Sequence, residues 1–335
     1  MKPKKNKVRA LGLCSGGLDS MLAAVILRQQ GIDTEWISFE TPFFSADKAR
    51  KAADLLGISL TVCNITDRYL PMLTAPPCGY GQHMNPCMDC HALMFRIAGE
   101  WMEANDFDFL FSGEVLGQRP FSQTRPSLRY VEKHSGRDGY IVRPLSARLL
   151  DETIPEKNGW IDRNRLMAIS GRSRKEQMAL AERFGIRHYP SPAGGCLLTD
   201  KGYSDRLRDV FAHQKVYRES ELHLLRYGRH FRLSAATRLI VGRTRDENEE
   251  LVRYVDPSLD VVLKTQGIPG PTAVLPGFSE DAAMLRLAAS ICAGYTKADR
   301  SQTVSVFANG VGYREAFSIF PLPPQEVRER LIGGS

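Results

Sequence analysis

Strand and helix signals alternate regularly through the first half of this 335-residue sequence. The strand-like runs are Val8–Leu13, Thr34–Phe39, Ser59–Asn64 and Phe107–Ser112, and the helical runs between them are Ser20–Gln30, Ala46–Gly57 and His91–Ala104. Repeated strand–helix–strand units fold into a parallel sheet with helices on both faces, because each crossover helix must pack back onto the sheet. We therefore predict an α/β domain with a parallel sheet in this half.

The character of the sequence changes near residues 200 to 205. A basic helical stretch is expected to about Arg229, followed by short strands at Thr237–Val241, Val261–Lys264, Ala273–Leu275, Thr303–Phe307 and Tyr313–Phe320. The last two strands flank Asn309–Gly310, which is a hairpin signal. We predict two domains, residues 1–202 and residues 203–335, the second being a smaller α+β domain.

Three further segments connect the elements of the first domain. We predict loops at Pro120–Asp138 and Pro190–Gly195, and a helix over Asp162–Phe184. Hydrophobic residues make up 43% of the chain and charged residues 25%, which is typical of a folded globular protein. The apolar run Val8–Cys14 is too short for a secretory signal or a membrane helix, so we expect a cytoplasmic protein without a membrane partner.

The formal net charge of +7 is concentrated in one segment. Residues 206–245 hold ten Lys or Arg and three acids, which gives this segment alone a net charge of +7. A concentrated basic segment indicates a polyanion-binding surface. A solvated surface neutralised by neighbouring acids is the alternative, since Asp246–Glu250 follow at once.

A glycine-rich hexapeptide separates the first predicted strand from the first predicted helix. It consists of Ser15, Gly16, Gly17, Leu18, Asp19 and Ser20. Small residues let the backbone approach a polyphosphate closely, and the N–H groups of a helix N-terminus face an anion. Ser15 and Ser20 can add hydroxyl hydrogen bonds to a pyrophosphate, and Asp19 can orient Mg²⁺ or the loop. The hexapeptide predicts a nucleotide-binding loop, although an ordinary turn with an N-cap serine has a similar composition.

The hexapeptide resembles the SGGxDS signature of the PP-loop ATP pyrophosphatases and differs from the Walker A pattern. The resemblance covers approximately residues 8 to 200. It implies ATP and Mg²⁺ as cofactors, with the loop holding the β- and γ-phosphates while a substrate oxygen attacks the α-phosphate. An adenylate and pyrophosphate are then the products. The superfamily includes synthetases of several kinds besides tRNA thiolases, so the hexapeptide alone does not identify the substrate.

The segment after the strand Phe107–Ser112 narrows the range of substrates that the sequence allows. It consists of Gly113, Glu114, Val115, Leu116, Gly117 and Gln118. Ligands bind at the carboxyl edge of open α/β sheets, where this segment is expected to lie. Together with Ser122–Gln123 and Arg143–Leu145 it resembles the TGESLGQ…SQT segment of the tRNA 4-thiouridine synthase family, with Arg119–Phe121 as an insertion. The resemblance implies that Gly113, Glu114 and Gln118 contact the adenylate or the uracil; a plain glycine turn is the alternative.

Seven cysteines are distributed in two groups. Cys14, Cys63 and Cys292 lie singly in apolar runs, where a buried structural thiol is expected. Cys78, Cys87, Cys90 and Cys196 lie in Gly/Pro-rich loops, where ligating or reactive thiols are common. A Cys-x-x-Cys tetrapeptide such as Cys87–Cys90 occurs in redox pairs, zinc sites and iron–sulfur sites alike.

Asn85–His91 resembles the NPCxxC segment of the tRNA 2-thiouridylases, and a distal third cysteine recurs in the iron–sulfur members of the thiolase group. The resemblance implies a [4Fe–4S] cluster held by Cys87, Cys90 and Cys196, with the fourth iron carrying the sulfur. In a second interpretation Cys90 carries a persulfide and Cys196 resolves it, without metal. In a third, Cys78 joins Cys87 and Cys90 in a structural zinc site with Cys196 or His91.

The strand Arg238–Val241, the charged turn after it and the loop Gly267–Thr272 resemble the RNA-binding domain of the NFACT proteins, in which a GR…EN segment precedes a PG loop. A small basic packing or dimerisation domain is the alternative. Together the resemblances imply a tRNA sulfurtransferase that adenylates a uridine carbonyl oxygen, with C4 favoured over C2. Its partners would be tRNA and a sulfur donor, either a cysteine desulfurase persulfide or sulfide. A PP-loop enzyme acting on a small molecule and a non-catalytic ATP- and RNA-binding factor are the competing hypotheses.

Overall fold

The computed structural model describes residues 7–191, 195–279 and 281–333. Met1–Asn6, and Pro192–Gly194 of the predicted loop, lie outside the described residues. The chain divides into two compact units, Met1–Cys196 and Leu197–Ser335, and each is described by itself. No helix within the described ranges is long and apolar enough to cross a membrane.

The first unit is built on a five-stranded parallel sheet with the strand order β3-β2-β1-β4-β5. The strands are β1 (Arg9–Leu13), β2 (Asp33–Glu40), β3 (Leu60–Asn64), β4 (Phe109–Ser112) and β5 (Ile141–Val142). The chain runs β1-β2-β3 toward one edge and then returns to place β4 beside β1. This parallel architecture confirms the fold class predicted from the alternating signals.

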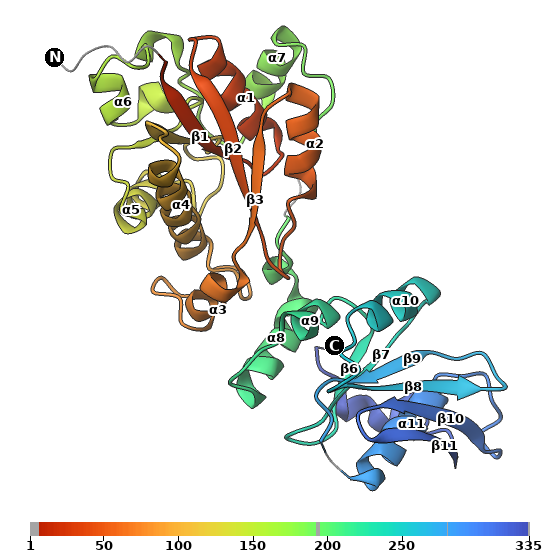
Figure 1. The fold of residues 1–335 in the computed structure, drawn as a ribbon. Helices are drawn as coiled ribbons and strands as arrows, with labels where there is room; N and C mark the ends of the chain where they lie inside the picture. Colours follow the sequence, from red (N-terminus) through yellow and green to blue (C-terminus); the bar gives the residue numbers. More distant parts are fainter. Residues whose placement is uncertain (1–6, 192–194, 280, 334–335) are drawn as a thin grey trace. The chain divides into compact units, whose positions relative to one another are not determined.

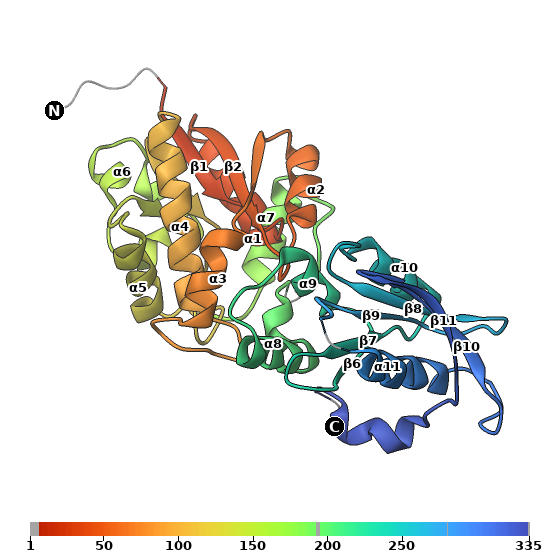
Figure 2. The same cartoon turned by 60° about the horizontal axis from the view of Figure 1, so that its bottom comes forward.

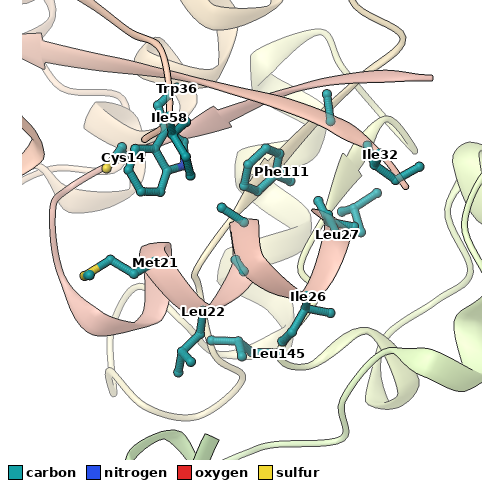
Figure 3. Close-up of a cluster of buried hydrophobic side chains, with 14 of the residues drawn as sticks. Cys14, Met21, Leu22, Ile26, Leu27, Ile32, Trp36, Ile58, Phe111 and Leu145 are labelled. Atoms are coloured by element: carbon teal, nitrogen blue, oxygen red, sulfur yellow. The ribbon is translucent and has the colours of Figure 1, made fainter. Parts of the chain in front are cut away.

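Helices cover both faces of the parallel sheet (Figures 1 and 2). On one face lie α1 (Leu18–Arg28), α2 (Asp47–Leu56) and α7 (Lys175–Arg183), and on the other lie α4 (Cys87–Ala104) and α5 (Arg125–Ser135). The shorter helices are α3 (Thr66–Thr74) and α6 (Ile154–Lys157). Figure 3 shows Leu22 and Ile26 of α1 with Phe111 and Trp36 of the sheet in the main core. This packing fixes the start of α1 relative to the strand ends.

Two segments of the first unit differ from the sequence prediction. The predicted loop Pro120–Asp138 contains α5, because the Thr124 side chain caps the helix by accepting from the Ser127 N–H, and because Leu128 and Val131 are buried. The helix predicted over Asp162–Phe184 is limited to α7. The residues before α7 form a short 3-10 helix, Arg163–Arg165, and then pair with the loop after β4, for example through a hydrogen bond from the Gly171 N–H to the Leu116 carbonyl at 2.8 Å.

The second unit contains a six-stranded antiparallel sheet with the order β11-β10-β8-β9-β7-β6. The strands are β6 (Arg229–Arg232), β7 (Arg238–Val241), β8 (Val261–Gln266), β9 (Thr272–Leu275), β10 (Val304–Gly310) and β11 (Tyr313–Ile319). The helices are α8 (Lys201–His213), α9 (Glu219–Leu224), α10 (Arg245–Arg253) and α11 (Ala282–Gly294). β10 and β11 form the predicted hairpin, with Gly310 opposite Tyr313. The helix α11 was not predicted.

The two faces of this antiparallel sheet are covered differently. The helix α11 packs on one face, where its apolar side chains join inward residues of all six strands in the larger core cluster. On the opposite face Leu224 of α9 and Leu251 of α10 pack with Ile240 of β7 and Val274 of β9 in a smaller cluster. Among the described residues this smaller cluster includes no residue of β8, β10 or β11.

Candidate active site

The glycine-rich hexapeptide forms the turn between β1 and α1, as its sequence position requires. Gly17 is the N-cap residue of α1. Gly16 has a φ of +71°, and a Cβ there would lie 2.1 Å from the carbonyl carbon of Lys48, so only glycine fits. The Ser20 hydroxyl donates to the Gly17 carbonyl at 2.7 Å, and Ser15 Oγ accepts from the Gly17 N–H at 3.4 Å. The first-turn N–H groups of α1 lack acceptors within the helix and are available to an anion.

The second motif packs directly on this turn. A Cβ on Gly113 would lie 2.3 Å from the carbonyl carbon of Asp19 and 2.4 Å from the backbone nitrogen of Ser20. The Gln118 amide donates from Nε2 to Asp19 Oδ2 at 3.1 Å. Residues about 100 positions apart in the chain are thus brought together at the carboxyl edge of β1 and β4, because these two strands are neighbours in the parallel sheet.

Asp19 has one carboxylate oxygen that the protein leaves without a partner. Its Oδ1 atom is buried and accepts no hydrogen bond from the described residues. Burial raises the pKa of Asp19, and the Gln118 amide with the guanidinium groups of Arg174 and Arg119 opposes this rise. An unsatisfied buried carboxylate oxygen is costly, so this atom is suited to a ligand such as Mg²⁺ or a water that accompanies it.

Three residues around Asp19 were missed by the sequence analysis. Gln177 on α7 is fully buried beside Asp19, and neither its amide nitrogen nor its amide oxygen has a hydrogen-bond partner in the described chain. Arg174 and Arg119 lie close enough to lower the pKa of Asp19. The sequence signal that could have identified Arg174 was the basic string Arg172–Lys175, which lies within the helix predicted over Asp162–Phe184. The candidate phosphate site is therefore lined by more cations than the hexapeptide indicated.

Glu114 is buried at the centre of a charged network. Its Oε1 atom is 2.8 Å from His91 Nδ1, and its Oε2 atom accepts from Ser112 Oγ at 3.1 Å and from Arg143 Nε at 2.9 Å. Arg143 also pairs with Glu132. Burial raises the pKa of Glu114, but the Arg143 guanidinium and the His91 ring outweigh it and lower the pKa to about 2. Both oxygens of Glu114 are thus engaged by side chains of the protein.

The predicted cysteine loop forms the first turn of α4, which begins at Cys87 and not at His91 as expected. The Cys87 thiol donates to Asn85 Oδ1 at 2.9 Å. Burial raises the pKa of the Cys87 thiol, while Arg119 and Asn85 oppose the rise. Cys90 is buried, and burial followed by the nearness of Cys196 raises the pKa of its thiol well above the usual range. None of the seven cysteines forms a disulfide.

Cys87, Cys90 and Cys196 gather around Tyr69 of α3, which the sequence analysis did not single out. The Tyr69 ring is completely buried against Phe43 and Phe44, with ring centroids 5.6 Å and 5.5 Å away. Burial, and then the sulfur atoms of Cys90, Cys196 and Cys87, raise the pKa of its hydroxyl. Three thiols that are far apart in the sequence thus lie near one buried hydroxyl group.

The cysteine set and the nucleotide turn belong to the same site. The Arg119 guanidinium opposes the rise in the pKa of both Asp19 and Cys87, so it lies near both groups. His91 directly follows Cys90 and its ring contacts Glu114. Gly113, the residue before Glu114, packs on the backbone of Asp19 and Ser20. The three predicted motifs therefore converge at one end of the parallel sheet.

Cys87, Cys90 and Cys196 share Tyr69 as a neighbour, but their side chains are not arranged as a metal-ligand group in the described structure. Throughout the residues that the structure describes, no group of three or more His, Cys, Asp or Glu side chains is placed to hold a metal ion. Cys78, a partner in the predicted zinc site, is exposed, and its N–H donates to Asp89.

The basic segment 206–245 is largely neutralised within the second unit. Six of its ten cations pair with carboxylates: Arg208–Asp205, Arg218–Asp260, Arg232–Asp209, Arg238–Glu221, Arg243–Glu247 and Arg245–Glu249. Four of these acids lie outside the segment, so a charge count along the sequence overstated the available positive charge. The Arg229 guanidinium lies 4.7 Å from the centre of the Tyr295 ring.

A parallel sheet whose first strand leads through Ser-Gly-Gly-x-Asp-Ser into a helix defines the first unit as a PP-loop ATPase domain. Comparison with known proteins agrees with this class. Residues 6–154 match the family described as thiamine biosynthesis protein (ThiI), and residues 228–331 match the family described as NFACT protein RNA binding domain. Two separate segments of the chain are thus similar to a ThiI-family domain and to an NFACT RNA-binding domain.

Individual relatives match mainly the first unit. A probable tRNA sulfurtransferase of Caldanaerobacter subterraneus subsp. tengcongensis is 32% identical over 136 residues, covering 38% of this chain and 34% of the relative. A tRNA-specific 2-thiouridylase of Fusobacterium nucleatum is 23% identical over 180 residues, covering 52% of this chain and 45% of the relative. The chain thus spans less than half the length of these relatives. A solved 4-thiouridine synthetase–RNA complex with bound ATP is 21% identical, with a TM-score of 0.36, over 53% of this chain and 52% of that one.

Proposed function

We propose that this chain is an ATP-dependent tRNA sulfurtransferase that forms a thiouridine, with 4-thiouridine favoured over 2-thiouridine. The convergence of the nucleotide turn, the segment after β4 and the cysteine set at one end of the sheet carries the proposal. An enzyme that only adenylates has no need for three thiols beside its phosphate site. The names of the matched relatives, which include tRNA sulfurtransferases, support the same activity.

We assign adenylation to residues 1–202. Ser15–Ser20 would hold the β- and γ-phosphates of ATP by backbone N–H groups and hydroxyls. The buried Oδ1 atom of Asp19 would hold a Mg²⁺ ion, which would offset the negative charge of the phosphates. Gly113 and Gln118 keep Asp19 in place, and Glu114 positions His91. The uridine carbonyl oxygen attacks the α-phosphate, pyrophosphate leaves, and the base becomes a good electrophile.

We assign sulfur transfer to Cys90 and Cys196. A cysteine desulfurase persulfide would transfer its outer sulfur to the Cys90 thiolate and leave as a thiol, whereas sulfide as the donor would attack the adenylated carbon directly and displace AMP. In the persulfide route, the terminal sulfur on Cys90 attacks the adenylated carbon, Cys196 attacks the Cys90 sulfur, AMP leaves, and a Cys90–Cys196 disulfide remains to be reduced. A [4Fe–4S] cluster on Cys87, Cys90 and Cys196 stays a prediction that iron and sulfide analysis of anaerobically purified protein tests.

We assign RNA binding to residues 203–335, on the strength of the match to the NFACT RNA-binding family over residues 228–331. A cytoplasmic location also stays a prediction. The deciding experiment is nucleoside analysis of tRNA from cells lacking this protein. Loss of one thionucleoside, restored by the intact gene and not by an Asp19→Ala version, is the expected result. An unchanged thionucleoside profile would contradict the proposal and favour a small-molecule substrate or a non-catalytic ATP- and RNA-binding factor.

A further inference from the structure

One face of the second unit carries an aromatic side chain, that of Phe307, which belongs to neither core cluster found among the described residues of this unit. The strand register aligns Phe307 of β10 with Lys264 of β8 on one side and Ala316 of β11 on the other. Its neighbours along the strand, Val306 and Ala308, are fully buried in the core under α11. Successive side chains of a strand point to opposite faces, so Phe307 points away from α11.

We call this surface the open face: the alternate residues Val262–Gln266 of β8, Ser305–Asn309 of β10 and Arg314–Ser318 of β11. The open face is continuous with the part of the sheet on which α9 and α10 pack, because Val262 of β8 lies opposite Val274 of β9 in the strand register. Lys264 and Arg314 are exposed, and Phe307 is half-buried. The open face is therefore a sheet surface of mostly small and polar side chains around one aromatic ring.

The charge of the open face is positive. Lys264 and Arg314 belong to it, whereas the register places no Asp or Glu side chain on it. In the described part of the chain neither cation forms an ion pair, in contrast to the six paired arginines of segment 206–245. An isologous contact between two copies would bring these like charges together, which disfavours self-association.

A hollow adjoins the aromatic ring. It has a volume of about 370 Å³, and apolar side chains of α10 and the following loop, including Val252, Val255 and Pro257, form its wall opposite Val262 and Phe307. The Asp260 carboxylate at its edge already binds Arg218. A flat apolar ring beside an apolar hollow, with cations on the same face, matches what an unstacked nucleobase and its phosphates require.

We propose that the open face is a stacking platform for single-stranded RNA, with a base on Phe307 and phosphates on Lys264 and Arg314. The proposal rests on the RNA-binding role proposed above and specifies which surface performs it and for which kind of RNA. Sheets with exposed aromatic residues bind unpaired bases in this way because every base has a π-face. Duplex RNA would not place a base on the ring.

The test uses the full chain and a fluorescein-labelled oligouridylate of about 12 nucleotides, with binding followed by fluorescence anisotropy. Phe307→Ala and Phe307→Leu are expected to weaken binding about 5- to 150-fold, the range for loss of one stacked base. Phe307→Trp should retain it. Val216→Ala, which removes an exposed apolar side chain away from the sheet, is the control. Thermal unfolding of every variant verifies folding.

The cations are tested through the salt dependence. Lys264→Gln and Arg314→Gln should each lower the slope of log affinity against log salt by about 0.7, as expected for one lost phosphate contact on a single strand. If Phe307→Leu binds the oligouridylate as tightly as the wild-type chain does, the stacking-platform proposal is wrong. The sulfurtransferase proposal is unaffected by that result. A wild-type chain that binds neither the oligouridylate nor tRNA removes the RNA-binding role, and the platform with it. Self-association that Phe307→Ala abolishes would identify the open face as a protein interface instead.

Discussion

Replacing Gly113 by alanine tests the closest contact between two motifs of the candidate active site. A Cβ on Gly113 would lie 2.3 Å from the carbonyl carbon of Asp19 and 2.4 Å from the Ser20 nitrogen, whereas ordinary contact begins at 3.4 Å. The two segments must therefore separate by about 1 Å. Both contacted atoms belong to the backbone, so the nucleotide turn itself must move.

The size of the effect follows from this displacement. Overpacking of this kind costs about 1–3 kcal/mol, and each kcal/mol lowers the melting temperature of a unit of this size by about 2–4 °C. A misplacement of about 1 Å at an active site can reduce the rate about 100-fold. Gly113→Ala is thus expected to fold, to melt several degrees earlier, and to lose most of its adenylation rate.

The assay is pyrophosphate release in the presence of ATP and tRNA, with the melting temperature measured on the same sample. Gly202→Ala is the matched control, because a Cβ on Gly202 in α8 meets no backbone atom and lies 3.2 Å from the end of the flexible Arg206 side chain and 3.5 Å from Asp200 Oδ1. The control should keep full activity. A Gly113→Ala variant that is folded and releases pyrophosphate within about twofold of the wild-type rate would refute the argument from geometry.

Three further predictions concern the same unit. Asp19→Ala should abolish pyrophosphate release with an unchanged circular dichroism spectrum; normal ATP turnover would remove the PP-loop assignment. Cys90→Ala and Cys196→Ala should stop thiouridine formation but not pyrophosphate release, whereas Cys63→Ala should be neutral in both assays, and equal loss in all three would indicate a folding defect. The pKa of Glu114 is about 2 in the folded state against an ordinary value of 4.5. The ionised carboxylate therefore stabilises the fold above about pH 4.5, and this contribution is lost as the pH falls toward 2. Glu114→Gln should lose about 3 kcal/mol of unfolding free energy at pH 7 and flatten the pH dependence of the urea midpoint below pH 5; parallel curves for the two proteins would contradict this.

Local sequence patterns were sufficient where the responsible interactions are local. The strands β1 to β4 and the hexapeptide turn were predicted because apolar runs and glycine spacing report backbone preferences within a few residues. The β10–β11 hairpin was predicted for the same reason. The helices α5 and α11 were missed, and α7 was overextended, because their limits depend on capping and on pairing with distant loops such as Leu116 with Gly171.

The sequence by itself determined the parallel fold class and the nucleotide turn, because each follows from residue types at short spacing. The tertiary structure alone decided that Arg119, Arg174 and Gln177 surround Asp19, since strand order and helix packing bring these residues together from separate segments. It also decided which cations remain available. The sequence shows that Arg218 and Arg238 are charged. It does not show that they pair with Asp260 and Glu221, because these ion pairs join residues of separate segments and form only in the folded chain.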